Sequence, residues 1–442
     1  MATTKLSRTI GTPTSGTKFT VSAWVKGSMA EGRILTSING NSSQTWVELQ
    51  NSGAFRIANY VGSYNMQLIT TRLFRDPSAW YHFVIAFDTT QGTDTNRVKL
   101  YVNGVQETSF STTTYPSQNL VLKYGVSGQT FNVGAKDTDT YWNGSMSHVH
   151  FIDGLQYAAS DFGETNSTSG IWIAKTSPSV TYGNNGFFLK MENASAMGTD
   201  SSGESNTFTV SGSLTKNQDT PDNNFATMNP LDNYFAGGTF SNGNNTITSG
   251  NNIYSYNTST VGVNTGKFYW ECKWSATPTG SGSQLGIGIA KRPTTAISDF
   301  LGSNLYSYAY FGGGAVNHND SQVITYNSYA IGDIIGIALD MDNNRLYFSK
   351  NGTFENSSNP ANGTNPISIL APDSVNGDSG VYFAGFGDGN NNLQHTAQFN
   401  FGNGFFGTTA VSSAGTNASG NGIFEYDTPT GYTALSTKGL NS

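Results

Sequence analysis

Carboxylate side chains are the first candidates for catalysis, because two carboxyl groups flanking a glycosidic bond suffice for its hydrolysis, one as acid and one as base or nucleophile. On a strand such groups would form a tight set of the type E-x-D-x-x-E. The glutamates of this chain are scattered singly, and Glu48, Glu107 and Glu271 each stand alone in a strand-like run. We interpret these three as members of exposed strand faces. A G-x-S-x-G nucleophile motif and a phosphate-binding loop are also absent, so the sequence predicts no catalytic residue and no enzyme.

Histidine and aspartate residues are the next candidates, because imidazole binds transition metals and carboxylates bind calcium. His148 and His150 share a strand face, but no Cys, Asp or Glu stands at matching spacing, so we interpret them as surface residues. His82 is interpreted as a packed structural residue. Asp137 and Asp139 are candidate calcium ligands, with a solvated Asp-Thr-Asp-Thr loop as the alternative. We therefore expect no cofactor, with calcium as the one metal to test.

Aromatic side chains favour binding over catalysis, because sugars stack their apolar faces on exposed rings. Tyr141 and Trp142 lie at the junction of a loop and a strand, and Tyr306, Tyr308 and Tyr310 alternate along one strand face. We predict these five residues as ligand-binding positions. The alternative is that the rings belong to the core or to a subunit interface, where tyrosine is also enriched.

The elements that must position these residues are strands. Of the 442 residues only 12% are charged while 13% are aromatic, and there are 52 glycines. This composition is typical of an all-β protein rich in turns. The net charge is −7 and no Lys/Arg cluster occurs, which disfavours nucleic acid as a partner. No apolar run is long enough to cross a bilayer, the start lacks a signal-peptide core, and the single cysteine, Cys272, excludes an intrachain disulfide.

Two hairpins repeat one pattern: KLYVNGVQE at Lys99–Glu107 and RLYFSKNGTF at Arg345–Phe354, each turning on Asn-Gly. A polar stretch separates the two halves. We predict a first domain over 1–218, a linker over 219–236 and a second domain over 237–442. In the strand from Trp80 to Phe87 both faces are apolar, so we expect its outer face to be covered by a loop, the other domain or another subunit. In LGIGIA and IIGIALD one face is almost bare, and we expect the chain's own segments to cover it.

Longer motifs resemble known families. WYHFVIAFDTTQ, NRVKLYVNGVQE and YWNGSMSHVHFIDGLQYAASDF occur in this order and resemble the concanavalin A-like, laminin-G-like jelly roll over roughly 1–195. The DSSG element comes late, at Asp200–Gly203, which indicates a permuted arrangement with the closing strand beside the N-terminal one. GKFYWECKW, LGIGIA, GDIIGIALDMDNNRLYFSKNGTF and QFNFGNGFF resemble a SPRY domain over about 237–442. The resemblance implies two antiparallel β-sandwich (jelly-roll) domains in tandem, the second SPRY-like.

The whole chain also resembles virion structural proteins of marine tailed phages, and three hypotheses follow. The first is a tail-fibre-like adhesin on the phage particle whose lectin-like domains contact host surface glycans or protein receptors. The second is a capsid decoration or neck/tail protein that uses both sandwiches as interaction modules, and the third is a polysaccharide depolymerase. The implied partners are other virion proteins, further copies of the chain in a homo-oligomer such as a trimer, and a host receptor. Synthesis would take place in the bacterial cytoplasm, with neither nucleic-acid binding nor membrane insertion.

Overall fold

A computed structural model describes residues 3–27, 30–167, 170–235, 237–251, 253–278, 282–373, 378–389 and 392–441. The chain divides into two compact units, Met1–Lys216 and Asn217–Ser442, which are considered separately below. Both units are all-β, as predicted, and within the described residues the only helices are short 3₁₀ turns: η1 (Asp94–Asn96), η2 (Lys123–Gly125), η3 (Ala159–Asp161), η4 (Glu355–Ser357) and η5 (Gly439–Asn441).

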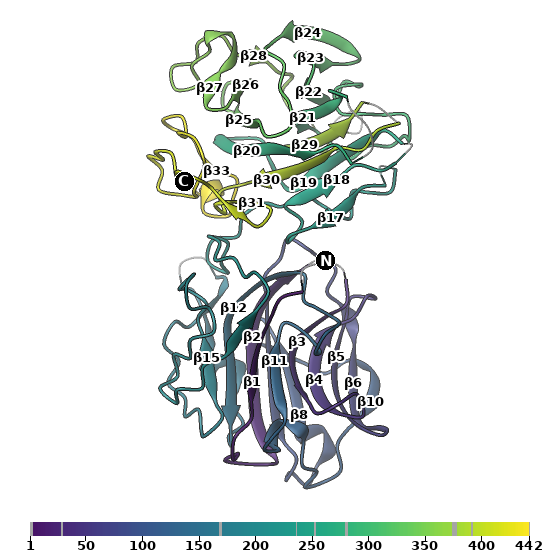
Figure 1. The fold of residues 1–442 in the computed structure, drawn as a ribbon, viewed down its shortest axis with the longest axis vertical. Helices are drawn as coiled ribbons and strands as arrows, with labels where there is room; N and C mark the ends of the chain where they lie inside the picture. The colour runs from purple at the N-terminus through teal and green to yellow at the C-terminus, as the bar shows by residue number, and fades with distance from the viewer. Residues whose placement is uncertain are drawn as a thin grey trace. The chain divides into compact units, whose positions relative to one another are not determined.

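The first unit is a sandwich of two antiparallel sheets (Figure 1). The eight-stranded sheet has the order β10 (Phe110–Thr114), β6 (Tyr64–Leu73), β5 (Ala54–Val61), β4 (Ser43–Leu49), β3 (Gly32–Ile38), β11 (Thr130–Val133), β1 (Lys5–Thr9), β16 (Thr209–Ser211). The six-stranded sheet has the order β15 (Phe187–Leu189), β12 (Gly144–Asp153), β2 (Lys18–Gly27), β7 (Tyr81–Asp88), β8 (Val98–Val102), β9 (Val105–Glu107). A small ribbon joins β13 (Gly163–Thr165) to β14 (Trp172–Ala174).

Local sequence accounts for most of this arrangement. Alternating apolar residues of the two sheets meet in one core, for example Phe83, Ile85 and Phe87 on β7. The β8–β9 hairpin turns at Asn103 and Gly104, whose φ angles are 48° and 84°, as the Asn-Gly pair predicts. Strand β16, which follows the DSSG element, pairs with the N-terminal β1, in agreement with the expected permutation.

The second unit has the same two-layer design. Its larger sheet contains β17 (Thr239–Ser241), β18 (Thr246–Thr248), β30 (Thr396–Asn400), β20 (Lys267–Ala276), β25 (Ile334–Asp340), β26 (Arg345–Lys350) and β27 (Thr353–Phe354), with β28 (Ile367–Ser368) beside β26 and β33 (Thr433–Ala434) beside β20. The facing sheet has the order β19 (Ser255–Val263), β29 (Tyr382–Asp388), β21 (Leu285–Ala290), β22 (Ser307–Phe311), β23 (Ala315–His318), β24 (Ser321–Thr325). Strands β31 (Phe405–Phe406) and β32 (Thr409–Ala410) form a separate ribbon, and the β26–β27 hairpin turns on Asn351 and Gly352.

The expected linker over 219–236 is part of the second unit. Phe225 and Met228 are 1% and 0% exposed and belong to the hydrophobic core of that unit. Phe225 also forms a β-bridge with Ser436 near the C-terminus. The boundary between the compact units falls at 216/217. The polar composition of this stretch favoured a linker although two of its apolar residues are anchored in the core.

The bare strand faces of the second unit are covered by the chain itself, as expected. On β25, a Cβ on Gly336 would lie 2.4 Å from Ser349 Oγ and 2.5 Å from the Tyr269 hydroxyl, and Leu301 is fully buried over the glycines of β29, the neighbour of β21. Phe311 covers Gly286 of β21 in the same way, at 2.8 Å. Glycine is needed here because a neighbouring side chain approaches the backbone too closely for any other residue.

A strap formed by residues 155–167 and 170–183 covers the outer face of the six-stranded sheet in the first unit. Thr20 Oγ1 donates a hydrogen bond to the Leu155 carbonyl (3.0 Å) and accepts one from the Tyr157 amide (2.9 Å). Apolar side chains of the strap then pack on the outer residues of the strands, in a cluster comprising Val84, Ile152, Ala159, Phe162, Tyr182 and Phe188. The cover predicted for the Trp80–Phe87 strand is therefore a loop of the same domain.

His82 links this strap to the sheet. Trp172 Nε1 donates a hydrogen bond to His82 Nδ1 (2.9 Å), so the neutral ring carries its proton on Nε2 and donates it to Ser22 Oγ (2.9 Å). The ring is fully buried, stacked on Trp24 at 4.7 Å, and burial lowers its pKa from 6.5 to about 3. The interpretation of His82 as a packed structural residue is confirmed.

We expect this arrangement to make the first unit acid-sensitive. The folded pKa of His82 lies below the unfolded value, so its contribution to stability is present above pH 6.5 and is lost as the pH falls toward about 3. Between pH 6.5 and about 4.5 the loss attributable to His82 is on the order of 2 kcal/mol. Urea unfolding at several pH values measures it, and His82→Gln, which cannot titrate, should flatten the dependence. The same pH dependence in both proteins would contradict this role.

Candidate functional site

Most of the aromatic residues predicted to bind ligand lie inside the molecule. Tyr308 and Tyr310 are 3% and 0% exposed in the core of the second unit, and Trp142 is 9% exposed in the core of the first. Tyr306 precedes β22 and is half-buried under the Arg292 guanidinium, 3.5 Å from its ring centroid, and Tyr141 is half-buried. The prediction that Trp142, Tyr308 and Tyr310 bind ligand at the surface is wrong, and the alternative of core positions fits. Tyr308 and Tyr310 lie on the face of β22 that points into the sandwich, and Trp142 packs into the first core just before β12 begins.

The histidine pair does not form a metal site. A register shift separates Ser147 from His150, and His148 has a φ of 48°, so the simple alternation assumed for the two histidines fails. His150 is 1% exposed and stacks on Phe188 at 3.9 Å, which corrects its interpretation as a surface residue. No group of three or more potential metal ligands occurs in the described part of the chain.

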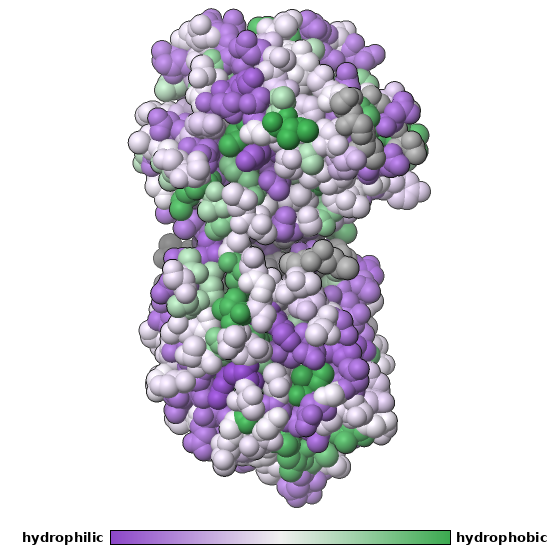
Figure 2. Space-filling model, viewed as in Figure 1, coloured by the Kyte–Doolittle hydropathy of each residue, from purple (hydrophilic) through white to green (hydrophobic). Residues whose placement is uncertain are grey.

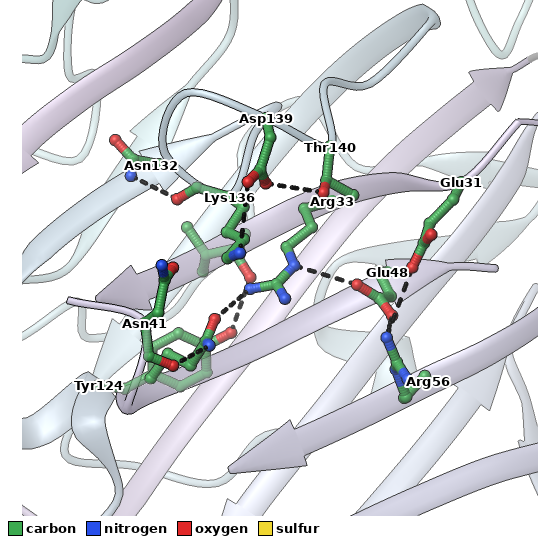
Figure 3. Close-up of polar contacts among 12 residues, drawn as sticks. Glu31, Arg33, Asn41, Glu48, Arg56, Tyr124, Asn132, Lys136, Asp139 and Thr140 are labelled. Atoms are coloured by element: carbon green, nitrogen blue, oxygen red, sulfur yellow. Dashed lines mark hydrogen bonds and ion pairs between the residues drawn. The ribbon is translucent and has the colours of Figure 1, made fainter. Parts of the chain in front are cut away.

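The two candidate calcium ligands are engaged in ion pairs instead. Asp137 Oδ1 lies 2.8 Å from Lys5 Nζ, and Asp139 Oδ2 lies 3.3 Å from Lys136 Nζ (Figure 3 shows the second pair). Both carboxylates are more than half exposed, at 57% and 59%. These contacts fit the alternative that was kept open, a solvated loop.

The outer face of the eight-stranded sheet in the first unit carries polar, charged and aromatic side chains, most of them buried. Pairing registers align Asn132, Thr36, Trp46 and Ala58 in one row across β11, β3, β4 and β5. The next row contains Arg33, Glu48 and Arg56. Because strand residues alternate, the neighbours Val47 and Ile57 point the other way into the core.

An ion-pair network occupies the second row (Figure 3). Glu48 Oε2 accepts a hydrogen bond from Arg33 Nε (3.0 Å), and its other oxygen pairs with Arg56 Nη2. Arg56 Nη2 also lies 3.5 Å from Glu31 Oε1, and Arg33 Nη1 donates to Gln44 Oε1 (2.6 Å). The Glu48 side chain is 0% exposed, so the prediction of an exposed strand-face glutamate was wrong.

Both arginines also contact the ring of Trp46. The guanidinium carbons of Arg33 and Arg56 lie 4.2 and 5.6 Å from its ring centroid, within the range of a cation–π attraction. Burial raises the pKa of Glu48, while Arg56 and Arg33 act in the opposite direction, and burial lowers the pKa of Arg33. Each charge therefore remains in the sheet only because the others neutralise it.

Two tyrosines extend this network to the surface. Tyr60 is half-buried and Tyr64 is 44% exposed, with their ring centroids 5.2 Å apart. Trp46 lies behind them, 6.0 Å from Tyr64. The result is an aromatic rim whose inner ring, Trp46, also contacts Arg56. We name it the Tyr60–Tyr64 rim.

Two buried polar atoms lie in the same row as Trp46 and lack a protein partner. Thr36 Oγ1 and Asn132 Oδ1 have no hydrogen-bond partner among the described residues. Buried groups of this kind are normally satisfied by ordered water or by a bound molecule.

The sequence contained a signal for this site that was not used. TWVELQ alternates Trp46 and Glu48 with core residues, and FRIANY places Arg56 and Tyr60 on the same face of the neighbouring strand. A tryptophan, a glutamate and an arginine on outer positions of paired strands indicate a buried charge network. What the pattern omits is Arg33, whose position depends on a bulge between Arg33 and Leu35.

Glu271 in the second unit is a second glutamate that sequence reasoning placed at the surface and that is 0% exposed. It accepts hydrogen bonds from the backbone amides of Glu425 and Tyr426, both at 2.9 Å, and from the Asn400 side chain at 3.2 Å. Burial raises its pKa to about 7 against the effect of these donors. Its role is structural, because it fastens the segment around 425 to strand β20.

Neither buried glutamate is arranged for glycoside hydrolysis. Such chemistry needs a carboxyl group that reaches the substrate and exchanges a proton. Glu48 is inaccessible and neutralised by two guanidinium groups, and Glu271 is enclosed by donors. The geometry of the outer face favours binding through rings and hydrogen bonds.

The fold is that of an all-β protein with two β-sandwich domains. Residues 4–159 match the model of the concanavalin A-like lectin/glucanases superfamily, and residues 267–365 match that of the SPRY domain. The chain therefore carries a concanavalin A-like lectin/glucanase domain followed by a SPRY domain. No curated protein matches the chain.

Among solved structures, the chain is similar to the SPRY domain of human HERC1, at 20% identity and a TM-score of 0.31, covering 39% of this chain and 96% of that chain. It is also similar to a native heptameric SAP-like pentraxin from Limulus polyphemus, at 15% identity and a TM-score of 0.29, covering 40% of this chain and 87% of that one. Of the helices in the described residues, none is long and apolar enough to cross a membrane.

Removing the central carboxylate of the network should strongly destabilise the first unit. Glu48→Ala leaves two guanidinium groups uncompensated at a buried position, which costs about 3–5 kcal/mol. Chemical denaturation followed by tryptophan fluorescence measures the loss. Glu31→Gln is the matched control, because Glu31 is 37% exposed and its pair should contribute less than about 1 kcal/mol. Equal effects of the two substitutions would contradict the central role of Glu48.

Proposed function

We propose that this chain is a non-enzymatic recognition protein whose first domain binds a surface glycan at the Tyr60–Tyr64 rim. The observation that carries the proposal is the exposed Tyr64 ring, held beside half-buried Tyr60 and backed by Trp46. Rings held in place by packing offer contact area at a small entropic cost. Arg56, 5.6 Å from the Trp46 ring behind the rim, and its ion-pair partner Glu31 carry donors and acceptors that the hydroxyl groups of a longer glycan can use.

The surface composition is consistent with polar recognition. On the face drawn in Figure 2, hydrophobic residues form small patches separated by hydrophilic ones. A protein that associates mainly through apolar contacts would be expected to display a larger continuous patch. A sugar, with one apolar face and many hydroxyl groups, suits a surface that mixes isolated rings with polar side chains.

The setting we propose is the surface of a bacteriophage particle, with this chain as a tail-fibre-like adhesin that contacts host glycans or protein receptors. This part of the proposal is supported by the resemblance of the paired modules to virion structural proteins of marine tailed phages. The second candidate is a capsid decoration or neck/tail protein, for which both sandwiches would serve as contacts to other virion proteins. Immunogold labelling of intact particles separates the two, since a few copies at the tail support the adhesin and many copies on the head support decoration.

Tyr64→Ala should weaken glycan binding about tenfold without unfolding the domain, because an exposed aromatic anchor contributes on the order of 1.4 kcal/mol or more. The measurement is a titration of the purified protein against a glycan array and against susceptible cells. Tyr234→Ala is the matched control, since Tyr234 is 91% exposed but belongs to the other unit. If the unmodified protein binds no glycan and no cell, the proposed site is wrong. It is also wrong if Tyr64→Ala and Tyr234→Ala lose binding equally.

A depolymerase activity would instead release reducing ends from host capsule. We expect none, because Glu48 has no access to a substrate and both of its oxygens are paired with arginines. A reducing-sugar assay with purified capsule would reveal any such release.

A further inference from the structure

The second unit contains a hollow beside the β26–β27 hairpin and the 3₁₀ turn η4. The hairpin lies at the edge of the larger sheet (Figure 1). Its volume is about 650 Å³, which falls in the range of small-molecule sites. The walls are mostly polar, and the lining residues that matter below are Asn327, Thr353, Phe354, Glu355, Asn356 and Ser357. This hollow lies within the second unit and takes no part in the Tyr60–Tyr64 rim.

A buried carboxylate lines the hollow and is only half used. Glu355 is 5% exposed, and its Oε2 atom accepts hydrogen bonds from the backbone amide (3.2 Å) and the side-chain amide (2.8 Å) of Asn327. Within the described part of the chain, Oε1 has one polar neighbour at hydrogen-bond distance, the Tyr310 hydroxyl at 3.5 Å. That hydroxyl donates its single proton to the Asn327 carbonyl, so it cannot also satisfy Oε1. Oε1 is therefore an acceptor without an effective donor.

The backbone next to this carboxylate is strained. Asn356 has φ 54° and ψ 31°, and Ser357 follows with φ 50°. Consecutive left-handed conformations are costly for residues other than glycine, and such strain concentrates at binding sites. The Asn365 side chain donates to the Asn356 carbonyl (3.1 Å) and helps hold this conformation.

The charges around the hollow restrict what it can bind. Lys350 is the only cationic lining residue, and its Nζ atom lies 3.3 Å from Asp333 and donates to the Ser328 carbonyl at 2.7 Å. The carboxylate of Glu355 has no cation within ion-pair distance among the described residues. The site consequently disfavours an anion and favours a neutral or cationic ligand that donates hydrogen bonds.

We propose that this hollow binds a single neutral or amino sugar residue, which gives the chain a second glycan site on its SPRY domain. A sugar hydroxyl or ammonium group donates to Glu355 Oε1. The amide of Asn356 and the hydroxyl groups of Thr353 and Ser357 contact the other hydroxyls. The half-buried Phe354 ring packs against the apolar face of the sugar. This site stands on its own residues and does not depend on the proposed function of the first domain.

The test uses saturation-transfer NMR on the full chain, with methyl glycosides of glucose, galactose, mannose, N-acetylglucosamine, glucosamine and glucuronic acid. All proteins carry Tyr64→Ala, so that the first domain contributes little. Thr353→Trp fills the hollow from an exposed position on β27, and Thr409→Trp on β32 is the control, since Thr409 is also exposed in a two-residue strand. A change of less than a few degrees in melting temperature shows that the variants fold.

We expect at least one neutral or amino sugar to bind the Tyr64→Ala protein and its Thr409→Trp derivative. Thr353→Trp should weaken that binding at least tenfold. Glu355→Gln should weaken it as well, because a charge-assisted hydrogen bond becomes a neutral one. Glucuronic acid should not bind.

Three outcomes would overturn the inference: no sugar binds the Tyr64→Ala protein, Thr353→Trp binds as well as its control, or glucuronic acid binds best. If the wild type binds glycans and Tyr64→Ala removes all binding, this second site is refuted while the first-domain proposal stands. If the second site binds sugar and Tyr64→Ala leaves the affinity for whole glycans unchanged, the first-domain proposal is refuted while this second site stands.

Discussion

A strand in a β-sandwich ordinarily turns one face to the core and the other to water, yet in this chain the outer faces are buried as well. Apolar segments cover some of them: residues 155–167 and 170–183 lie over the six-stranded sheet of the first unit, and Leu301 lies over the glycine-rich strands of the second. On the eight-stranded sheet the cover is made of charged and aromatic side chains that satisfy one another. This double burial fixes which side chains are left for a ligand.

The two kinds of cover have different physical consequences. An apolar strap contributes hydrophobic burial, but its attachment to His82 through Trp172 makes it sensitive to acid. A charge network contributes little net stability, because desolvation offsets most of the attraction. What it supplies is rigidity and position: Arg33, Glu48 and Arg56 hold Trp46, and Trp46 backs the tyrosines of the rim.

This division also bears on the role in recognition that we propose. The carboxylate oxygens of buried Glu48 pair with two arginines, and those of buried Glu271 accept hydrogen bonds from backbone amides. These contacts hold strands and segments together. The groups that remain available are rings at the edge of a sheet and one unsatisfied carboxylate oxygen at the edge of another. The Asn-Gly hairpins that recur in both domains belong to the scaffold, since both meet the same turn requirement of positive φ angles.

Much of the fold could be predicted from the sequence by itself. Alternation, turn residues and the family motifs predicted two all-β sandwiches, both Asn-Gly hairpins, the covered faces of the Trp80–Phe87 strand and the late strand beside β1. The strands and hairpins depend on neighbours within a few residues, and local physical chemistry determines them, whereas the late strand beside β1 was expected from the position of the DSSG element in the family pattern. The expected linker is instead part of the second unit, because distant strands enclose its anchors Phe225 and Met228, which local sequence does not reveal.

The candidate site was decided by the tertiary structure. Period-two alternation divides strand residues into two sets but does not say which set faces the core or whether the outer set is covered, so Tyr308 and Tyr310 went inside and Tyr64 stayed outside. Glu48 is buried because Arg33 and Arg56 arrive from adjacent strands, and Glu271 because the segment around 425 folds over it. Sequence determined the strands, the turns and the two domains, whereas burial, charge pairing and the accessible surface follow from contacts between segments that only the folded chain brings together.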